Sequence, residues 1–324
     1  MSLEALRAEL ESRQVFKAWE IEENLDRYFF RPVAVPFTAA FRALRITPNQ
    51  VSVGGMLIGM VSIFFLFRSG IAGRSVAVVL LWISEILDAA DGQLARLVSE
   101  PSRYGRIIDG LCSTVLYVAV YVMIGMGLYA RTGRWLGPVL TAVAAVAHSL
   151  QSSLYDFYRT EYLRIVKHRD PVDADSLDSL RRAQAAKGRP RHAGQRILLA
   201  LYHHYAWRLV HTTPTYQPLK AAIERAFRGR AVPEDYAAAY AVEQRRMVRW
   251  WNYLGPNAHL LALSAAILAG RTEWYLGAVI AGFTLYALAV TWAQRGASSR
   301  LLRELRRRTG EPSPAEAASL AGTR

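Results

Sequence analysis

Long apolar stretches alternate with shorter polar ones over most of this 324-residue chain. A bilayer core about 30 Å thick requires about 20 mostly apolar helical residues, and six stretches approach that length. They are residues 49–67, 75–94, 107–129, 136–154, 251–268 and 274–292, and the fourth continues as a polar helix towards residue 165. The pattern predicts an all-α, polytopic membrane protein with six transmembrane helices.

The polar segments around these stretches predict an orientation. Residues 21–44 mix aromatic residues, prolines and arginines with apolar residues, which is typical of a helix lying in the membrane interface. Arginine is abundant in both termini, in the second-to-third loop and in the fourth-to-fifth loop. Because basic loops stay on the cytoplasmic side, we expect an integral protein of the inner, cytoplasmic membrane, with both termini and the active site on its cytoplasmic side.

The same pattern divides the chain into five expected parts. They are N-terminal cytoplasmic and interfacial helices (1–47), four spans (48–165), a basic cytoplasmic insertion (166–249), two spans (250–294), and a basic C-terminal helix with a tail (295–324). The insertion carries 16 Lys+Arg against 8 Asp+Glu. Both a subdomain on the membrane surface and a solvated segment without a catalytic part are consistent with that charge.

Composition narrows the class of protein. The net charge is +14 and hydrophobic residues make up 52% of the chain. Nucleic-acid binding is the other common reason for a basic chain, but here the basic residues lie between apolar stretches of membrane length, so we expect no nucleic-acid partner. Cys112 is the single cysteine. It excludes an intramolecular disulfide and a cysteine metal site, and we expect it to pack in the core.

Acidic residues interrupt the second span, where a carboxylate is costly and usually functional. Asp88 and Asp91 are three residues apart, so they share one face of a helix. Gly92 and Ala95 lie on the same face, where small side chains let a bulky group approach the backbone. Arg96 adds a positive charge at the cytoplasmic end.

The third span brings a further acid to the same depth. Gly105, Asp109 and Ser113 are spaced by four, again on one helical face. Three converging carboxylates repel one another unless cations intervene, and Mg²⁺ prefers such oxygen ligands. The alternative is a buried salt-bridge cluster of these acids with the arginines of the second-to-third loop, Arg96, Arg103 and Arg106.

This arrangement resembles a known family. The pattern Asp88-x2-Asp91-Gly92-x2-Ala95-Arg96-x8-Gly105-x3-Asp109-x3-Ser113 resembles the signature of the CDP-alcohol phosphotransferases, except at its last position. The segment ITPNQVS, residues 46–52, is also similar to that family. The resemblance implies six transmembrane helices with cytoplasmic termini.

The resemblance also implies a reaction and roles. Members bind a CDP-linked lipid or alcohol and two divalent cations, Mg²⁺ or Mn²⁺, and an acceptor hydroxyl displaces CMP. By resemblance, Asp88, Asp91 and Asp109 are metal ligands. The CDP moiety would contact Asp88, Gly92, Ala95 and Arg96, and Gly105 would keep the helix crossing close. Homodimers are common in the family, so a homodimer surrounded by membrane lipids is expected.

Ser113 stands where the family has a fourth aspartate, which serves as the base. A serine cannot act as a base at neutral pH, and losing a positioned base lowers a rate about 10²–10⁴-fold. Three explanations stay open. Glu85 or His148 supplies the base; the acceptor is acidic or assisted enough to need none; or the chain is a non-catalytic homologue that still binds CDP-lipid and metal.

The fourth span carries a polar stripe, His148, Ser152, Tyr155, Arg159 and Tyr162, at helical spacing. Ser152, Tyr155 and Arg159 are the candidates for binding the acceptor. Interhelical hydrogen bonding and interface anchoring are the alternative reason for such a stripe. The acceptor could be a small polar alcohol, a sugar phosphate or a lipid.

Other polar residues are weaker candidates. Asn252, Asn257 and His259 open the fifth span, and His203 with His204 resembles an interfacial anchor more than a metal site. A polyprenyl transferase would need a second acidic motif. Between residues 250 and 294 Glu273 is the only acid, which argues against that class.

Overall fold

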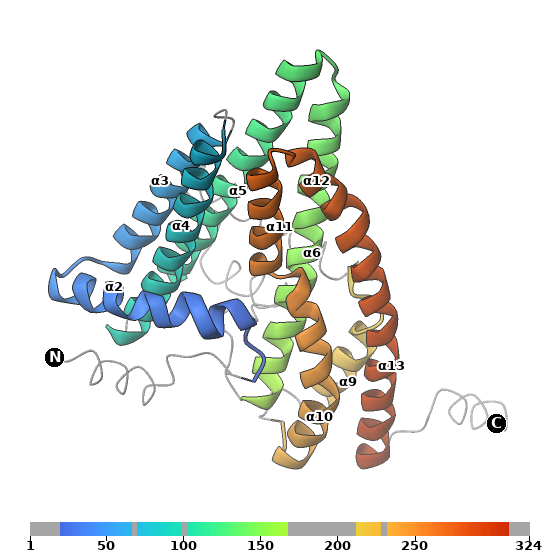
Figure 1. Cartoon of the computed structure of the whole chain (residues 1–324). Coiled ribbons are helices and arrows are strands. Elements are labelled where there is room, and N and C mark those ends of the chain that lie inside the picture. The colour runs from blue at the N-terminus through green and yellow to red at the C-terminus, as the bar shows by residue number, and fades with distance from the viewer. Residues whose placement is uncertain (1–19, 67–69, 99–102, 168–211, 228–231, 311–324) are drawn as a thin grey trace, which may run out of the picture. The chain divides into compact units, whose positions relative to one another are not determined.

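The computed structural model describes residues 20–66, 70–98, 103–167, 212–227 and 232–310, and all regular structure in these ranges is helical (Figure 1). The predicted all-α class is confirmed for this part of the chain. Side chains are described from residue 108 onward in the helix that begins at Arg103. Much of the predicted insertion, including His203 and His204, and the C-terminal tail lie outside the described residues.

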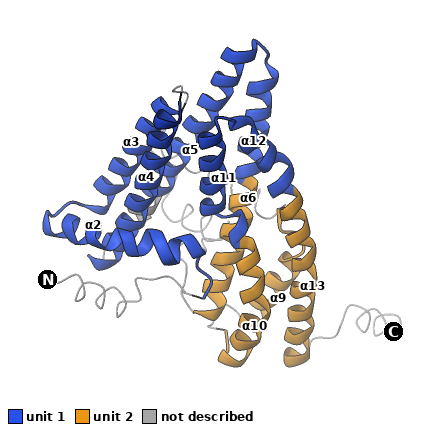
Figure 2. Ribbon diagram, in the orientation of Figure 1, with its two compact units in different colours: residues 1–149, 252–284 blue, residues 150–251, 285–324 orange. Residues whose placement is uncertain are grey.

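The chain forms two compact units (Figure 2). The first consists of residues 1–149 and 252–284, and the second of residues 150–251 and 285–324. The boundaries fall inside α6 (Leu136–Val166) and at the start of α13 (Thr284–Thr309). The carboxylates singled out by their spacing all belong to the first unit.

The first unit opens with the segment predicted to lie in the membrane interface. A π-helical turn, η1 (Asp26–Phe30), leads into α2 (Arg31–Ala43). Gln93 ties α2 to the acidic helix α4 (Ile71–Leu97): its side chain accepts a hydrogen bond from Thr38 at 2.9 Å and donates one to the Arg31 carbonyl at 2.9 Å. Buried polar groups need such partners, so Gln93 fixes how α2 lies along α4.

Helix α3 (Pro48–Phe65) begins where local chemistry predicts. The Thr47 hydroxyl accepts a hydrogen bond from the Gln50 backbone NH, and the Gln50 side chain accepts one from the Thr47 NH. This reciprocal capping box satisfies two backbone donors that a helix start leaves open. Pro48 occupies the first turn, where its missing NH costs nothing.

Two glycines let α3 pack closely against its neighbours. A Cβ at Gly55 would lie 3.2 Å from the Cβ of Leu87 on α4, and a Cβ at Gly59 would lie 2.5 Å from Leu116 on α5 (Arg103–Thr132). Ser84 of α4 donates a hydrogen bond to the Gly55 carbonyl at 2.8 Å. Small residues at helix contacts in membranes allow this approach. Helix α3 therefore packs against both helices that carry the acids (Figure 1).

The first unit closes with short helices: η2 (Asn252–Leu254), α11 (Pro256–Ala269), α12 (Thr272–Gly277) and the π-helical η3 (Ala278–Phe283). The predicted fifth span, 251–268, is broken near its start, so α11 begins only at Pro256 and has 14 residues. The Glu23 carboxylate accepts a hydrogen bond from the Asn257 backbone NH at 3.3 Å. Its negative charge interacts favourably with the positive end of the α11 helix dipole.

In the described ranges three helical stretches are long and apolar enough to cross a membrane: Pro48–Phe65, Ile108–Thr132 and Thr272–Thr309. They correspond to the first, third and sixth predicted spans. The last of them continues without a break into the predicted C-terminal helix. Helix α4 carries too many charges for that assignment and α11 is too short, so the six-span arrangement stays a prediction.

The second unit contains the described part of the predicted insertion, which is folded. Helices α9 (Gln217–Phe227) and α10 (Glu234–Trp251) belong to it. Glu161 of α6 is buried and bonds Lys220 of α9 at 3.0 Å and Arg164 at 2.6 Å. Gln294 of α13 donates to Gln244 of α10 at 3.0 Å. These polar contacts join the helices of this unit into a bundle.

Candidate metal and nucleotide site

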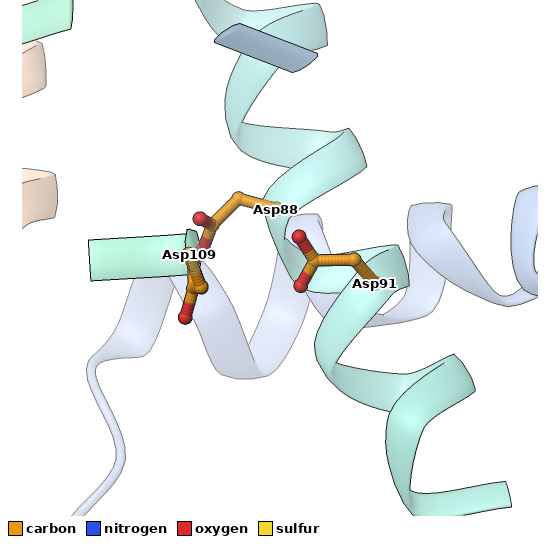
Figure 3. A group of neighbouring side chains, drawn as sticks. All are labelled: Asp88, Asp91 and Asp109. Atoms are coloured by element: carbon orange, nitrogen blue, oxygen red, sulfur yellow. The ribbon is translucent and has the colours of Figure 1, made fainter. Parts of the chain in front are cut away.

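The structure brings Asp88, Asp91 and Asp109 together, and we call these three residues the carboxylate triad. Each offers an oxygen, and these oxygens lie within 4.8 Å of one another. Asp88 and Asp91 come from successive turns of α4, and Asp109 lies near the start of α5 (Figure 3). Asp91 is buried, Asp109 half-buried and Asp88 exposed, so the triad is open to a ligand on one side.

Asp91 is held in place by a residue from a third helix. Ser52 of α3 donates a hydrogen bond from its hydroxyl to the Asp91 carboxylate, and the positive charge of Arg96 also attracts Asp91. Ser52 is the last residue of the segment 46–52. The sequence singled out that segment without giving Ser52 a role, because its contact with Asp91 depends on how α3 packs against α4.

The triad suits a divalent cation. Three carboxylates this close are mutually repulsive without positive charge between them, and their oxygens are the ligands that Mg²⁺ and Mn²⁺ prefer. The salt-bridge alternative needs Arg96, Arg103 and Arg106, and the last two side chains lie outside the described part. The triad could therefore bind a divalent metal ion.

The helix surface beside the triad is bare. A Cβ built at Gly92 would meet only the Arg96 guanidinium within 4 Å, at 3.4 Å, among the described residues. Arg96 folds back along α4 towards Gly92, and Ala95 is half-buried. A guanidinium beside a helix surface without a large side chain at Gly92 is suited to an anionic group. Gly105 lies in the first turn of α5.

Ser113 lies one turn beyond Asp109 on α5 and is half-buried. The same face continues with Tyr117 and Tyr121. The Tyr117 hydroxyl is buried and has no hydrogen-bond partner among the described residues, and it interacts electrostatically with Glu85 and Asp88. Tyr117 thus lies one turn beyond Ser113 on the same face of α5.

The two candidates for a replacement base lie in different surroundings. Glu85 is half-buried on α4, one turn before Asp88, and Asp26 and Asp109 are its interacting acids. His148 is buried on α6 and stacks on His259 of α11, with ring centroids 3.7 Å apart and an interplanar angle of 5°. His148 and His259 were separate candidates in the sequence, and the fold makes them one pair.

The other predicted residues have structural partners. Asn252 donates to the Ile21 carbonyl at 3.0 Å and Asn257 lies at the start of α11. In the second unit, Arg159 donates to the Tyr155 hydroxyl at 3.1 Å, Ser152 is half-buried and Tyr162 is fully buried. Cys112 is buried, consistent with packing.

Comparison with known proteins indicates which family this part of the chain resembles. Residues 45–174 match the sequence model of CDP-alcohol phosphatidyltransferase. Over these residues the chain is similar to the CDP-alcohol phosphatidyltransferase family. The matched residues include Ser52, the carboxylate triad, Ser113 and His148, so the predicted resemblance is confirmed.

Two relatives agree with this family. The chain is 26% identical over 136 residues to the phosphatidylinositol phosphate synthase of Mycobacteroides abscessus, an alignment covering 42% of this chain and 59% of that protein. It is 31% identical over 91 residues to the archaetidylinositol phosphate synthase of Pyrococcus horikoshii, covering 28% and 46%. The chain thus spans about half the length of the curated relatives it matches.

Proposed function

We propose that this protein is an integral-membrane phosphotransferase of phospholipid synthesis. It transfers a phosphatidyl or phospho-alcohol group from a CDP-linked donor to an acceptor hydroxyl and releases CMP. The observation that carries the proposal is the carboxylate triad, with its oxygens within 4.8 Å of one another, inside the segment that matches the family.

In this proposal the triad holds divalent cations, Mg²⁺ or Mn²⁺. Such cations neutralise a diphosphate and the charge that develops on a leaving phosphate. Ser52 fixes the Asp91 carboxylate, so part of the coordination geometry is set before the donor binds. Gly92 and Ala95 leave room for the CDP moiety, and Arg96 binds its phosphates.

We propose an inositol phosphate as the acceptor. Both relatives are named for the synthesis of inositol phosphate lipids. An anionic acceptor also suits a chain with a net charge of +14. Arg159, with Ser152 and Tyr155, remains the candidate for binding it on α6.

The membrane arrangement is also a proposal. In this proposal α4, α6 and α11 also cross the membrane, which makes six spans together with the three apolar helical stretches. The acids of α4 and α5 then lie near the cytoplasmic boundary. Acids inside a membrane protein commonly face the bundle interior rather than lipid. Both termini then lie in the cytoplasm of an inner-membrane protein, which forms a homodimer as its family commonly does.

Ser113 favours a second function, which is binding without catalysis. Because Ser113 occupies the position of the family base, the chain could bind CDP-lipid and metal without turnover. Such a homologue would keep the carboxylate triad, since binding alone requires it.

The test is CMP release from CDP-diacylglycerol by purified protein with Mg²⁺ or Mn²⁺. The acceptor panel contains inositol phosphate, glycerol phosphate, inositol and serine, and a Ser113→Asp variant is measured in parallel. Release by the unaltered chain with inositol phosphate supports the proposal. Release by Ser113→Asp alone supports the binding homologue, and no release by either chain contradicts the proposed transfer.

A further inference from the structure

We propose that the second unit binds the headgroups of anionic phospholipids through two arginines and two tryptophans, Arg246 and Trp250 of α10 and Trp292 and Arg295 of α13. We call these four residues the interfacial belt. All four belong to the second unit (Figure 2), and none belongs to the carboxylate triad. The inference goes beyond the proposed transfer reaction and rests only on the proposed crossing of the membrane by the stretch Thr272–Thr309.

Helices α10 and α13 run antiparallel beside each other. Near the end of α10, the Trp250 carbonyl accepts a hydrogen bond from the Tyr286 hydroxyl at 3.0 Å, and Tyr286 lies near the start of α13. Near the start of α10, Asp235 forms an ion pair with Arg308, which lies near the end of α13. Positions along one helix can therefore be matched with positions along the other.

Gln294 of α13 fixes the level of the belt. Its amide donates a hydrogen bond to the Gln244 side chain at 3.0 Å and accepts one from the Trp251 indole NH at 3.2 Å. The belt residues of α13 flank position 294, and those of α10 lie between positions 244 and 251. All four belt residues therefore lie at one level of the unit, within about two helical turns.

The belt is accessible from outside the unit. Arg246 and Arg295 are exposed, Trp292 is 75% exposed and Trp250 is half-buried. Because these side chains leave two separate helices at one level, a bilayer surface that surrounds the unit contacts all of them together. Tryptophan is enriched at the boundary between membrane and water, where its amphipathic ring lies at the level of the headgroups.

The exposed side chains of α13 change in character along the helix. Leu285 and Leu288 are apolar and are 66% and 62% exposed. Trp292 and Arg295 follow, and charged residues then continue to Arg308. A helix that passes from hydrocarbon through the headgroups into water shows this order. The belt thus marks the headgroup level of α13.

Two arginines beyond the belt are paired with acids, whereas the belt arginines are not. Arg300 pairs with Glu243 at 2.9 Å, and Arg307 pairs with Glu304 at 3.1 Å. Across the described ranges, neither belt arginine has an acidic partner. A lipid phosphate supplies the negative charge that complements these two exposed cations.

Trp250 prepares Arg246 for a phosphate. The guanidinium carbon of Arg246 lies 4.8 Å from the centroid of the Trp250 ring. Stacking occupies the flat face of a guanidinium and leaves the N–H donors along its edge, which bind phosphate oxygens in pairs. An arginine beside an anionic membrane surface gains about fivefold in affinity. We therefore expect the belt to prefer an acidic phospholipid over a zwitterionic one.

The first experiment measures that preference. The full chain is placed in nanodiscs of phosphatidylcholine and phosphatidylglycerol. Spin-labelled versions of both lipids report, by electron paramagnetic resonance, how strongly each associates with the protein. Arg246→Gln combined with Arg295→Gln should lower the preference for phosphatidylglycerol about twofold or more, because the signal averages the arginine effect over all lipids around the protein.

The matched control is Arg303→Gln combined with Arg306→Gln. It removes the same charge from α13, but at about 12 Å or more beyond Arg295 along the helix. That distance exceeds the Debye length of about 8 Å at physiological ionic strength, so this control should leave the lipid preference unchanged.

The second experiment measures depth in the membrane. A fluorophore is attached to the cysteine introduced by Leu285→Cys, Trp292→Cys or Arg303→Cys, each in a Cys112→Ala background. The nanodisc lipids carry a nitroxide quencher on either the acyl chain or the headgroup. We expect the acyl-chain nitroxide to quench the label at residue 285 most and the headgroup nitroxide to quench the label at residue 292 most. The label at residue 303 should be quenched least by both.

Each result decides for or against the belt. The inference is wrong if both double variants lower the preference for phosphatidylglycerol equally, or if neither lowers it. It is also wrong if the label at residue 292 is shielded from both nitroxides, because another protein surface, such as a second copy of this chain, then covers it. Neither readout uses CMP release, so failure of the proposed transfer reaction and failure of the belt are distinguishable.

Discussion

The hydroxyl of Ser52 donates a hydrogen bond to the carboxylate of Asp91, and this contact joins the start of α3 to the acidic face of α4. Its position depends on the capped entry of α3 at Thr47 and on the close packing of Gly55 against Leu87. A residue 39 positions earlier therefore sets the orientation of one member of the carboxylate triad.

Removing that hydroxyl should weaken the metal site without unfolding the protein. Groups that orient metal ligands are commonly worth 10–100-fold in metal affinity or activity. We expect Ser52→Ala to raise the Mg²⁺ concentration for half-maximal CMP release about tenfold or more. The control is Ser62→Ala, whose hydroxyl bonds its own helix at the Gly59 carbonyl. Equal Mg²⁺ dependence in both variants would show that Ser52 does not support the site.

The packing of α3 gives a second prediction with an internal control. A methyl group at Gly59 would overlap Leu116 at 2.5 Å, whereas a methyl group at Gly54 meets nothing within 4 Å. Overpacking typically costs about 1–3 kcal/mol, so Gly59→Ala should lower the melting temperature and Gly54→Ala should not. Thermal unfolding in detergent measures both. Similar melting temperatures would mean that α3 can move away from α5 at no cost.

Glu161 should anchor the second unit. It is buried against Lys220 and Arg164, so Glu161→Gln leaves two cations without their carboxylate. Because those cations are partly exposed, we expect a loss of about 2 kcal/mol. The matched control is Glu243→Gln, whose partner Arg300 lies at the surface and should contribute at most about 1 kcal/mol. The prediction fails if both variants unfold at the same temperature.

The same glutamate gives a pH dependence. Burial alone raises the pKa of Glu161, but Lys220 and Arg164 outweigh it and hold that pKa below the ordinary value of 4.5. A lowered pKa in the folded state adds stability above the unfolded value, and this stability is lost as the pH falls through the folded value. The natural chain should therefore exceed Glu161→Gln in free energy of unfolding by the largest amount near pH 7, and this difference should shrink below about pH 4.5. A constant difference down to low pH would contradict the ion-pair account.

Periodicity was enough to predict that the three carboxylates of the triad lie close together. Helical spacing placed Asp88 and Asp91 on one face, and the expected reversal of chain direction between the second and third predicted spans brought Asp109 near them. Both follow from local geometry and chain direction. The capped start of α3 is equally local. The Ser52 contact and the stack of His148 on His259 were not predictable, because they depend on how separate helices rotate against one another.

The insertion and the predicted fifth span show what a pattern along the sequence cannot predict. The count of charged residues over 166–249 predicted only that this segment is basic. The buried salt bridge between Glu161 and Lys220 joins residues 59 positions apart, and a charge pattern along the sequence cannot predict such a contact. The expected fifth span extended across Asn252–Gly255 because the stretch is apolar, while the backbone turns there so that Pro256 can start α11.

The most direct measurement of the central claim is whether the carboxylate triad places a divalent cation at the donor's diphosphate. Mn²⁺ would be titrated into the purified protein with CDP-diacylglycerol while the ³¹P relaxation of the diphosphate is recorded, using Asp109→Asn as the variant and the exposed Asp235→Asn as the control. The account predicts strong paramagnetic relaxation in the natural chain and in Asp235→Asn, and its loss in Asp109→Asn. Equal relaxation in all three proteins, or none in the natural chain, would contradict it.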